Sequence, residues 1–104
     1  MEYYLVYITC KNYKEANRLG KILLEEKLVA CINIVKQVYS QYWWKGKIEK
    51  SKESILLLKC PEKNLDRVVK RVKELHSYSL PDISAIKINK GLKEFINWVN
   101  NFLS

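Results

Sequence analysis

The order of strand-like and helix-like segments predicts an α+β protein. Segments rich in β-branched and aromatic residues alternate with segments whose apolar residues repeat at helical spacing, in the order βαββαβα. Right-handed crossovers place the first two helices on the same face of one sheet. The sequence therefore predicts a ferredoxin-like βαββαβ sandwich with a long hairpin between its second and third strands and an extra C-terminal helix. We expect residues 1–104 to form one domain.

The N-terminal part contains a strand and a helix. Residues 3–9 are almost all β-branched or aromatic, as expected for a strand covered on at least one face. Asn12 stands three residues before Glu15, which is a capping-box pair. Apolar residues at helical spacing then extend the predicted helix to about Lys27.

The next segment predicts a long hairpin. Strand-forming residues fill 28–44 and 48–60, and Lys45-Gly46 supplies the turn. Strands of about 14 residues would reach about 45 Å, whereas a globule of this size is only about 34 Å across. The hairpin must therefore bend sharply or overhang, and an overhang would expose an apolar edge that needs a cover. We expect a homo-oligomer closed through these strands.

Two helices and one strand complete the chain. Pro61 is expected to open a helix, in which apolar residues repeat at helical spacing as far as Leu75. After Pro81, residues 83–88 form a short strand, and Gly91 introduces a final helical stretch that ends near Leu103.

Composition argues against two classes of partner. The net charge is +8, but 16 of the 19 basic residues are Lys, which favours a solvated surface over phosphate recognition. The third strand lacks the aromatic residues of an RNA-recognition domain. No apolar run reaches the roughly 20 residues of a membrane helix, and the N-terminus lacks the basic segment of a signal peptide. We expect a cytosolic protein with no nucleic-acid or membrane partner.

The candidate reactive residues are the one histidine and the three cysteines. His76 lies near the end of the second predicted helix, where a histidine commonly bonds a free carbonyl. Alternatively it binds a metal, and a thiolate partner would favour Cu(I) or Zn. Cys10, Cys31 and Cys60 lack the spacing of a zinc or redox motif, so each is a core residue or a partner of His76. The sequence contains no catalytic signature, and we expect no enzyme.

A dispersed pattern runs along nearly the whole chain. It consists of Ala30-Cys31-Ile32-Asn33-Ile34, then Val38, Ser40, Tyr42, Trp44, Gly46 and Lys47, then Leu56-Leu57-Leu58-Lys59, then Glu74-Leu75-His76, Tyr78 and Pro81, and finally Trp98. This pattern resembles the CutA family, the divalent-cation tolerance proteins. The resemblance implies a ferredoxin-like fold and a tight homotrimer formed through the long strands.

The resemblance also implies a function and a set of residues. It implies a protein that binds copper or another divalent cation and contributes to metal tolerance. The implied metal ligands are His76, Cys10 and Cys31. The implied cleft between subunits is lined by Asn33, Tyr42, Trp44, Lys59 and Tyr78. An alternative is a PII-like trimeric sensing module, in which Lys59 and Lys47 would hold an anionic ligand.

This chain departs from the family pattern in two places. The family usually has His-Pro-Tyr-Glu-x-Pro-Glu, where this chain has Ser77, Ser79 and Asp82. The loss of a carboxylate at Ser79 weakens a site for a hard cation more than a softer Cys/His site. Lys36-Gln37 replaces the Pro-Gly usually found before the hairpin, from which we expect a straighter strand. Tyr42 and Trp44 could alternatively serve only as interface anchors.

Overall fold

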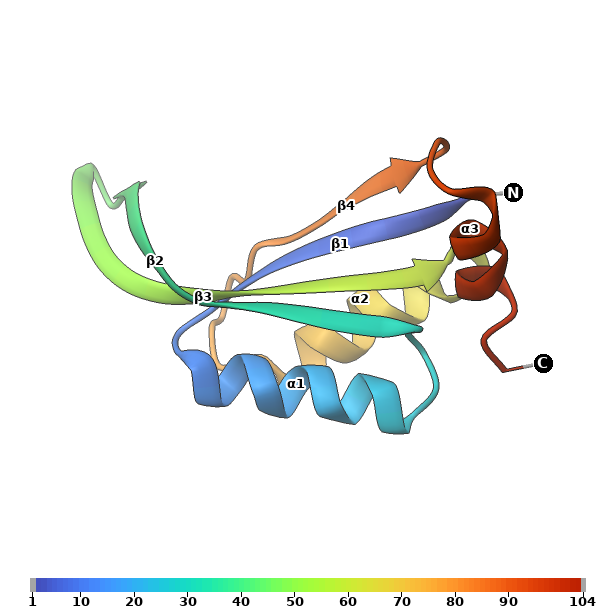
Figure 1. Ribbon diagram of the computed structural model, residues 1–104. Coiled ribbons are helices and arrows are strands. Elements are labelled where there is room, and N and C mark those ends of the chain that lie inside the picture. Colours follow the sequence, from blue (N-terminus) through green and yellow to red (C-terminus); the bar gives the residue numbers. More distant parts are fainter. Residues whose placement is uncertain (1, 104) are drawn as a thin grey trace.

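A four-stranded antiparallel sheet with helices on one face forms the body of the molecule (Figure 1). The computed structural model describes residues 2–103; Met1 and Ser104 lie outside them. The elements are β1 (Tyr3–Cys10), α1 (Tyr13–Glu25), β2 (Cys31–Trp44), β3 (Lys47–Pro61), a 3₁₀ turn (Glu62–Asn64), α2 (Leu65–Leu75), β4 (Ile83–Ile88) and α3 (Lys93–Asn100). The strand order β2-β3-β1-β4 confirms the ferredoxin-like prediction.

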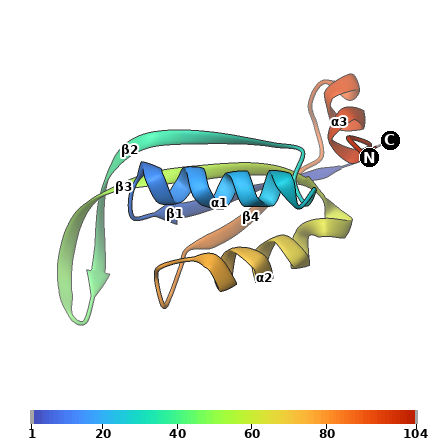
Figure 2. The same cartoon turned by 90° about the horizontal axis from the view of Figure 1, so that it is seen from below.

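The two faces of the sheet have different environments. Helices α1 and α2 both pack on one face (Figures 1 and 2), which we call the covered face. Alternate residues of β1 and β3, such as Val6 and Leu58, point into this core and are fully buried. The other face, which we call the open face, carries Tyr7, Val35 and Ile86, all more than one-third exposed. α3 packs only on one end of the open face, around Tyr3.

One close approach fixes the position of α1 on the covered face. A Cβ atom added at Gly20 would lie 2.5 Å from Ile32 Cδ1 and 3.1 Å from Leu56 Cδ1. Glycine at this helical position therefore lets α1 sit directly on β2 and β3.

The hairpin both bends and overhangs. The molecule is 46 Å long, and the far half of β2 and β3 curls away from α1 toward the open side (Figure 1). The register shifts between Val35 and Val38, where Lys36 and Gln37 form a bulge. The expectation of a straighter strand is therefore wrong. The Ser54 hydroxyl donates to the Lys36 carbonyl at 2.6 Å, which satisfies this carbonyl at the bulge without a Pro-Gly pair.

Three element boundaries differ from the expected ones. Pro61 ends β3 opposite Tyr3 rather than opening a helix, and α2 begins at Leu65 after the 3₁₀ turn. A proline fits at the end of a strand because no ladder donor is needed there. α1 ends at Glu25, Lys27 has a φ of 61° in the turn that follows, and β2 starts only at Cys31. The last helix, α3, spans only Lys93–Asn100.

Within residues 2–103, no helix is both long enough and apolar enough to span a membrane.

Candidate functional site

Three side chains with metal-binding atoms meet where β1, α1 and α2 come together. Cys10 is the last residue of β1, Glu15 lies in the first turn of α1, and His76 follows the last residue of α2. All three are buried, and their donor atoms lie within 4.8 Å of one another. The structure thus brings together two predicted ligands, Cys10 and His76, and adds Glu15.

The Glu15 carboxylate links two loops to the start of α1 by accepting hydrogen bonds from their backbone amides. The expected capping box is half formed, because Asn12 Oδ1 accepts from the Glu15 amide at 2.9 Å. The Glu15 carboxylate accepts instead from the Lys11 amide at 3.0 Å and from the Ser77 amide at 2.9 Å. Burial opposes ionisation, but hydrogen bonds from Ser77 and Lys11 outweigh it and hold the pKa of Glu15 below its ordinary value.

Hydrogen bonds fix the tautomer of His76. Nε2 lies 2.7 Å from the Thr9 carbonyl, which can only accept, and Nδ1 lies 3.0 Å from the Tyr78 amide, which can only donate. The ring is therefore neutral, with its proton on Nε2. The prediction that His76 bonds a free carbonyl is confirmed, but this carbonyl belongs to Thr9 of β1 and not to the end of α2.

Cys10 is held as a neutral thiol. Burial, together with the nearby carboxylates of Glu15 and Glu53, raises the pKa of Cys10 to about 12. Neither nitrogen of His76 is free to accept its proton, so these two residues do not form a nucleophile–base pair.

The donor types in this group fit a soft or borderline cation. A thiolate and an imidazole suit copper and zinc, and the carboxylate adds a third donor. A bound ion would replace the proton of Cys10 and one hydrogen bond of the His76 ring.

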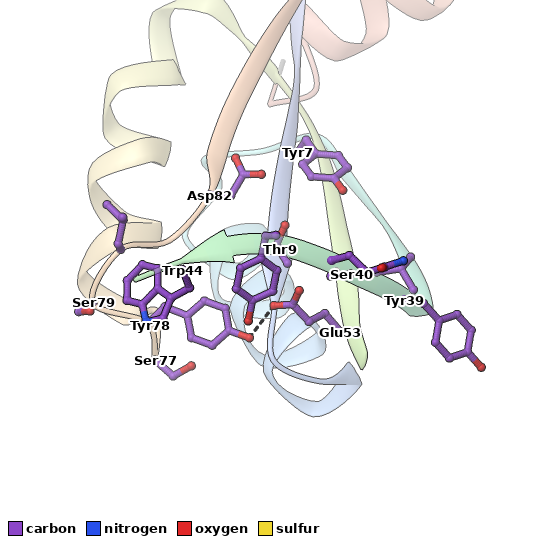
Figure 3. A pocket seen from close by; sticks show the side chains of 14 residues that line it. Tyr7, Thr9, Tyr39, Ser40, Trp44, Glu53, Ser77, Tyr78, Ser79 and Asp82 are labelled. Carbon is purple, nitrogen blue, oxygen red and sulfur yellow. Dashed lines mark hydrogen bonds between the residues drawn. The ribbon is translucent and has the colours of Figure 1, made fainter. Parts of the chain in front are cut away.

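A pocket of about 820 Å³ lies next to this group, between the curled hairpin and the segment that leads into β4 (Figure 3). Tyr42, Trp44 and Tyr78 contribute aromatic walls. Tyr78 donates from its hydroxyl to Glu53 Oε2 at 2.7 Å. Burial and the Glu53 carboxylate raise the pKa of Tyr78 well above its ordinary value, so this hydroxyl remains a donor.

The other predicted residues lie elsewhere on the open face. Lys59 Nζ donates to Asn33 Oδ1 at 2.8 Å, and Cys31 pairs with Lys59 across the strands. Cys10 is opposite Ser54 of β3, which places Cys31 roughly 17 Å further along the sheet. Within one chain, Cys31 is therefore not part of the Cys10–Glu15–His76 group.

The two lysines that would hold an anionic ligand in a PII-like sensing module are also far from each other. Lys47 lies at the hairpin turn and Lys59 near the opposite end of β3.

Two carboxylates of the site were not predicted. Glu15 was interpreted only as a helix cap. Glu53 is 7% exposed, although it lies in a strand segment with lysines. A signal for Glu53 was available, since it stands only two residues before the apolar run 55–58. Each carboxylate also has a partner from a distant part of the chain, Ser77 for Glu15 and Tyr78 for Glu53.

Comparison with known proteins gives a consistent result. The family model described as "CutA1 divalent ion tolerance protein" matches residues 4–102. The divalent-cation tolerance protein CutA of Archaeoglobus fulgidus is 44% identical over 95 residues, which is 91% of this chain and 92% of that protein. A chloroplastic CutA 1 protein of rice is 37% identical over 97 residues, 93% of this chain and 55% of that longer protein.

Solved structures agree. A structure titled as the periplasmic divalent cation tolerance protein CutA from Archaeoglobus fulgidus superposes with a TM-score of 0.89 at 43% identity. The superposition covers 93% of this chain and 94% of that chain.

Proposed function

The chain belongs to the CutA1 divalent ion tolerance protein family, and from this premise we propose that it is a homotrimeric, single-domain protein that binds copper or another divalent cation and contributes to tolerance of that metal. The convergence of a thiol, an imidazole and a carboxylate within 4.8 Å is the observation that carries the metal-binding part. His76 and Cys10 are the proposed ligands, and Glu15 is the added third.

Equilibrium dialysis with Cu and Zn tests the ligand assignment. Cys10→Ser is expected to remove most binding, because it replaces the soft donor. Cys60→Ser is the matched control, since Cys60 is equally buried on β3 and also has a raised pKa, of about 11. Cys31→Ser tests the remaining predicted ligand. Equal loss of binding in the Cys10 and Cys60 variants would contradict the assignment.

The open face supports the proposal of a trimer. Large apolar side chains there and on the hairpin are strongly exposed, including Val35 at 43% and Ile86 at 57%. β2 is also an edge strand of 14 residues. Exposed apolar area on this scale marks an interaction surface, and self-association around a closed axis would bury it on every copy.

Light scattering after size-exclusion chromatography measures the oligomer. The wild-type protein is expected at three times the mass of one chain. Val35→Asp places a charge on the open face and is expected to release smaller species. Leu24→Asp is the control, because Leu24 is similarly exposed, at 38%, but lies on helix α1. A wild-type monomer would refute the proposed trimer.

We also propose that the protein is cytosolic and that it binds its metal without catalysing a reaction. All three cysteines are free thiols, which suits the reducing cytosol. The relatives named above include chloroplastic and periplasmic proteins, so fractionation of source cells is the required test. A binding role without catalysis is supported by the neutral, fully hydrogen-bonded His76 ring.

A further inference from the structure

The pocket beside the hairpin has an unusual charge for this protein. The chain carries 19 basic residues and a net charge of +8. None of the described residues that line the pocket is basic, whereas two of them, Glu53 and Asp82, are acidic. The local charge is thus opposite in sign to the net charge. The basic group of Lys45 lies beside the lining, with its Nζ 6.0 Å from the centre of the Trp44 ring, but Lys45 is not itself a lining residue. The two carboxylates are therefore the charged groups of the lining.

Glu53 is positioned as a fixed anion in this pocket. It is only 7% exposed, so its carboxylate is largely shielded from bulk water. Tyr78 donates to Oε2 at 2.7 Å and holds the carboxylate in place (Figure 3). Among the described residues this is the one side-chain hydrogen bond to the Glu53 carboxylate, and Oε1 remains available to a ligand. A buried anion of this kind favours a cationic partner.

Aromatic rings supply the remaining recognition chemistry. Tyr7, Tyr42, Trp44 and Tyr78 line the pocket, while Tyr39 points away from it (Figure 3). In a single chain Trp44 and Tyr42 are 44% and 43% exposed, so their own subunit leaves part of each side chain uncovered. Ring faces attract ammonium groups, and aromatic walls around a carboxylate are suited to alkylated ammonium ions.

We propose that this pocket binds a small organic ammonium cation, with the charge placed against Glu53 and the alkyl groups against Trp44 and the tyrosines. This site is separate from the Cys10–Glu15–His76 group, whose soft donors suit a metal ion. A hard metal ion fits the pocket poorly, because rings and hydroxyl groups outnumber carboxylates in its lining. An anionic ligand would meet two carboxylates and no basic group among the lining residues of one chain.

Choline is a suitable probe, and 3,3-dimethylbutan-1-ol is its uncharged counterpart of the same shape. The full-length protein in its native assembly is titrated with each compound in excess EDTA, so that the result does not depend on metal binding. Calorimetry gives the affinity. The indole N–H signal of Trp44, assigned with Trp44→Phe, reports the location of binding. Choline is expected to bind and to move this signal, and the neutral compound is expected to bind at least tenfold more weakly.

Variants separate charge recognition from folding. Glu53→Gln keeps the shape and the acceptor for Tyr78, and it is expected to weaken choline binding at least tenfold. Glu25→Gln, at an exposed position on α1, is the control and is expected to have no effect. Trp44→Leu removes a partly exposed ring, and it is expected to weaken choline binding several-fold.

Three results would overturn the proposal. The first is equal affinity for choline and its neutral counterpart, which would indicate a merely apolar pocket. The second is full choline affinity in the folded Glu53→Gln protein. The third is no movement of the Trp44 signal on choline addition in the native assembly.

Discussion

The covered and open faces of one sheet are made by the same strands but have opposite properties. On β3, Leu56 and Leu58 point to the helices and are fully buried, while Leu57 between them points to the open face and is half-buried. On β1, Val6 and Ile8 are fully buried, whereas Tyr7 is 38% exposed.

The buried carboxylates on the two sides of the sheet also differ in how many hydrogen bonds they accept. Glu15, in the first turn of α1, accepts hydrogen bonds on both oxygens, and it stabilises the junction of β1, α1 and α2. Glu53, on the open side, accepts one from Tyr78. The covered face therefore accounts for the fold of one chain, whereas the open face carries the groups that can still bind a ligand or another subunit.

The largest expected effect comes from adjacent leucines on opposite faces. Leu58→Ala leaves a cavity under the helices and is expected to lower the free energy of unfolding by about 2–5 kcal/mol. Leu57→Ala, one residue away, is expected to weaken trimer association more than the fold of each chain. Urea denaturation and light scattering measure the two effects. If both variants lost chain stability equally, the distinction between the faces would fail.

A smaller effect is expected from the two carboxylates. Glu15→Gln places an amide N–H₂ against a backbone donor and is expected to cost about 1–3 kcal/mol at neutral pH. Glu53→Gln retains an acceptor for Tyr78 and is expected to cost less.

The acid dependence of stability sharpens the Glu15 prediction. Its folded pKa lies below the ordinary value of 4.5. Its contribution is therefore complete above pH 4.5 and is lost as the pH falls through the lower folded pKa. Urea denaturation from neutral to acid pH should show a shallower acid slope for Glu15→Gln than for the wild type. An unchanged slope would contradict this role.

The smallest expected effect is at the contact of α1 with the covered face. Gly20→Ala gains helix propensity of about 1 kcal/mol, but its Cβ would meet Ile32 and force repacking that costs about 1–3 kcal/mol. A net loss of about 1 kcal/mol is expected in thermal denaturation. Gly91→Ala is the control, because the nearest atom to its added Cβ lies at 3.7 Å. Equal melting temperatures for the two variants would show that the core relaxes freely around Gly20.

Periodicity was sufficient to predict the fold. The β-branched and aromatic run of β1 and the helical spacing of α2 depend on local sequence, so the type and order of these elements could be predicted. The bulge could not, because it depends on the Ser54 hydroxyl meeting Lys36 from 18 residues away.

The site was predicted less completely. Cys10 and His76 were named because thiols and imidazoles are few, but Glu15 and Glu53 are two acids among eleven. Their roles depend on Ser77 and Tyr78, which only the folded chain brings close. Whether Cys31, Asn33 and Lys59 join the other cleft residues across a subunit boundary remains a prediction.

The bulge at Lys36 and Gln37 also affects how the protein behaves at high concentration. β2 is the free edge of the sheet, and an unbroken edge of 14 residues would offer a long template for stray strands. The register shift divides this edge into two shorter ladders that run in different directions. An incoming extended chain can pair along only one of them, which discourages fibril-like stacking. The bend that aims the hairpin therefore also protects the protein from aggregation while its subunits are still separate.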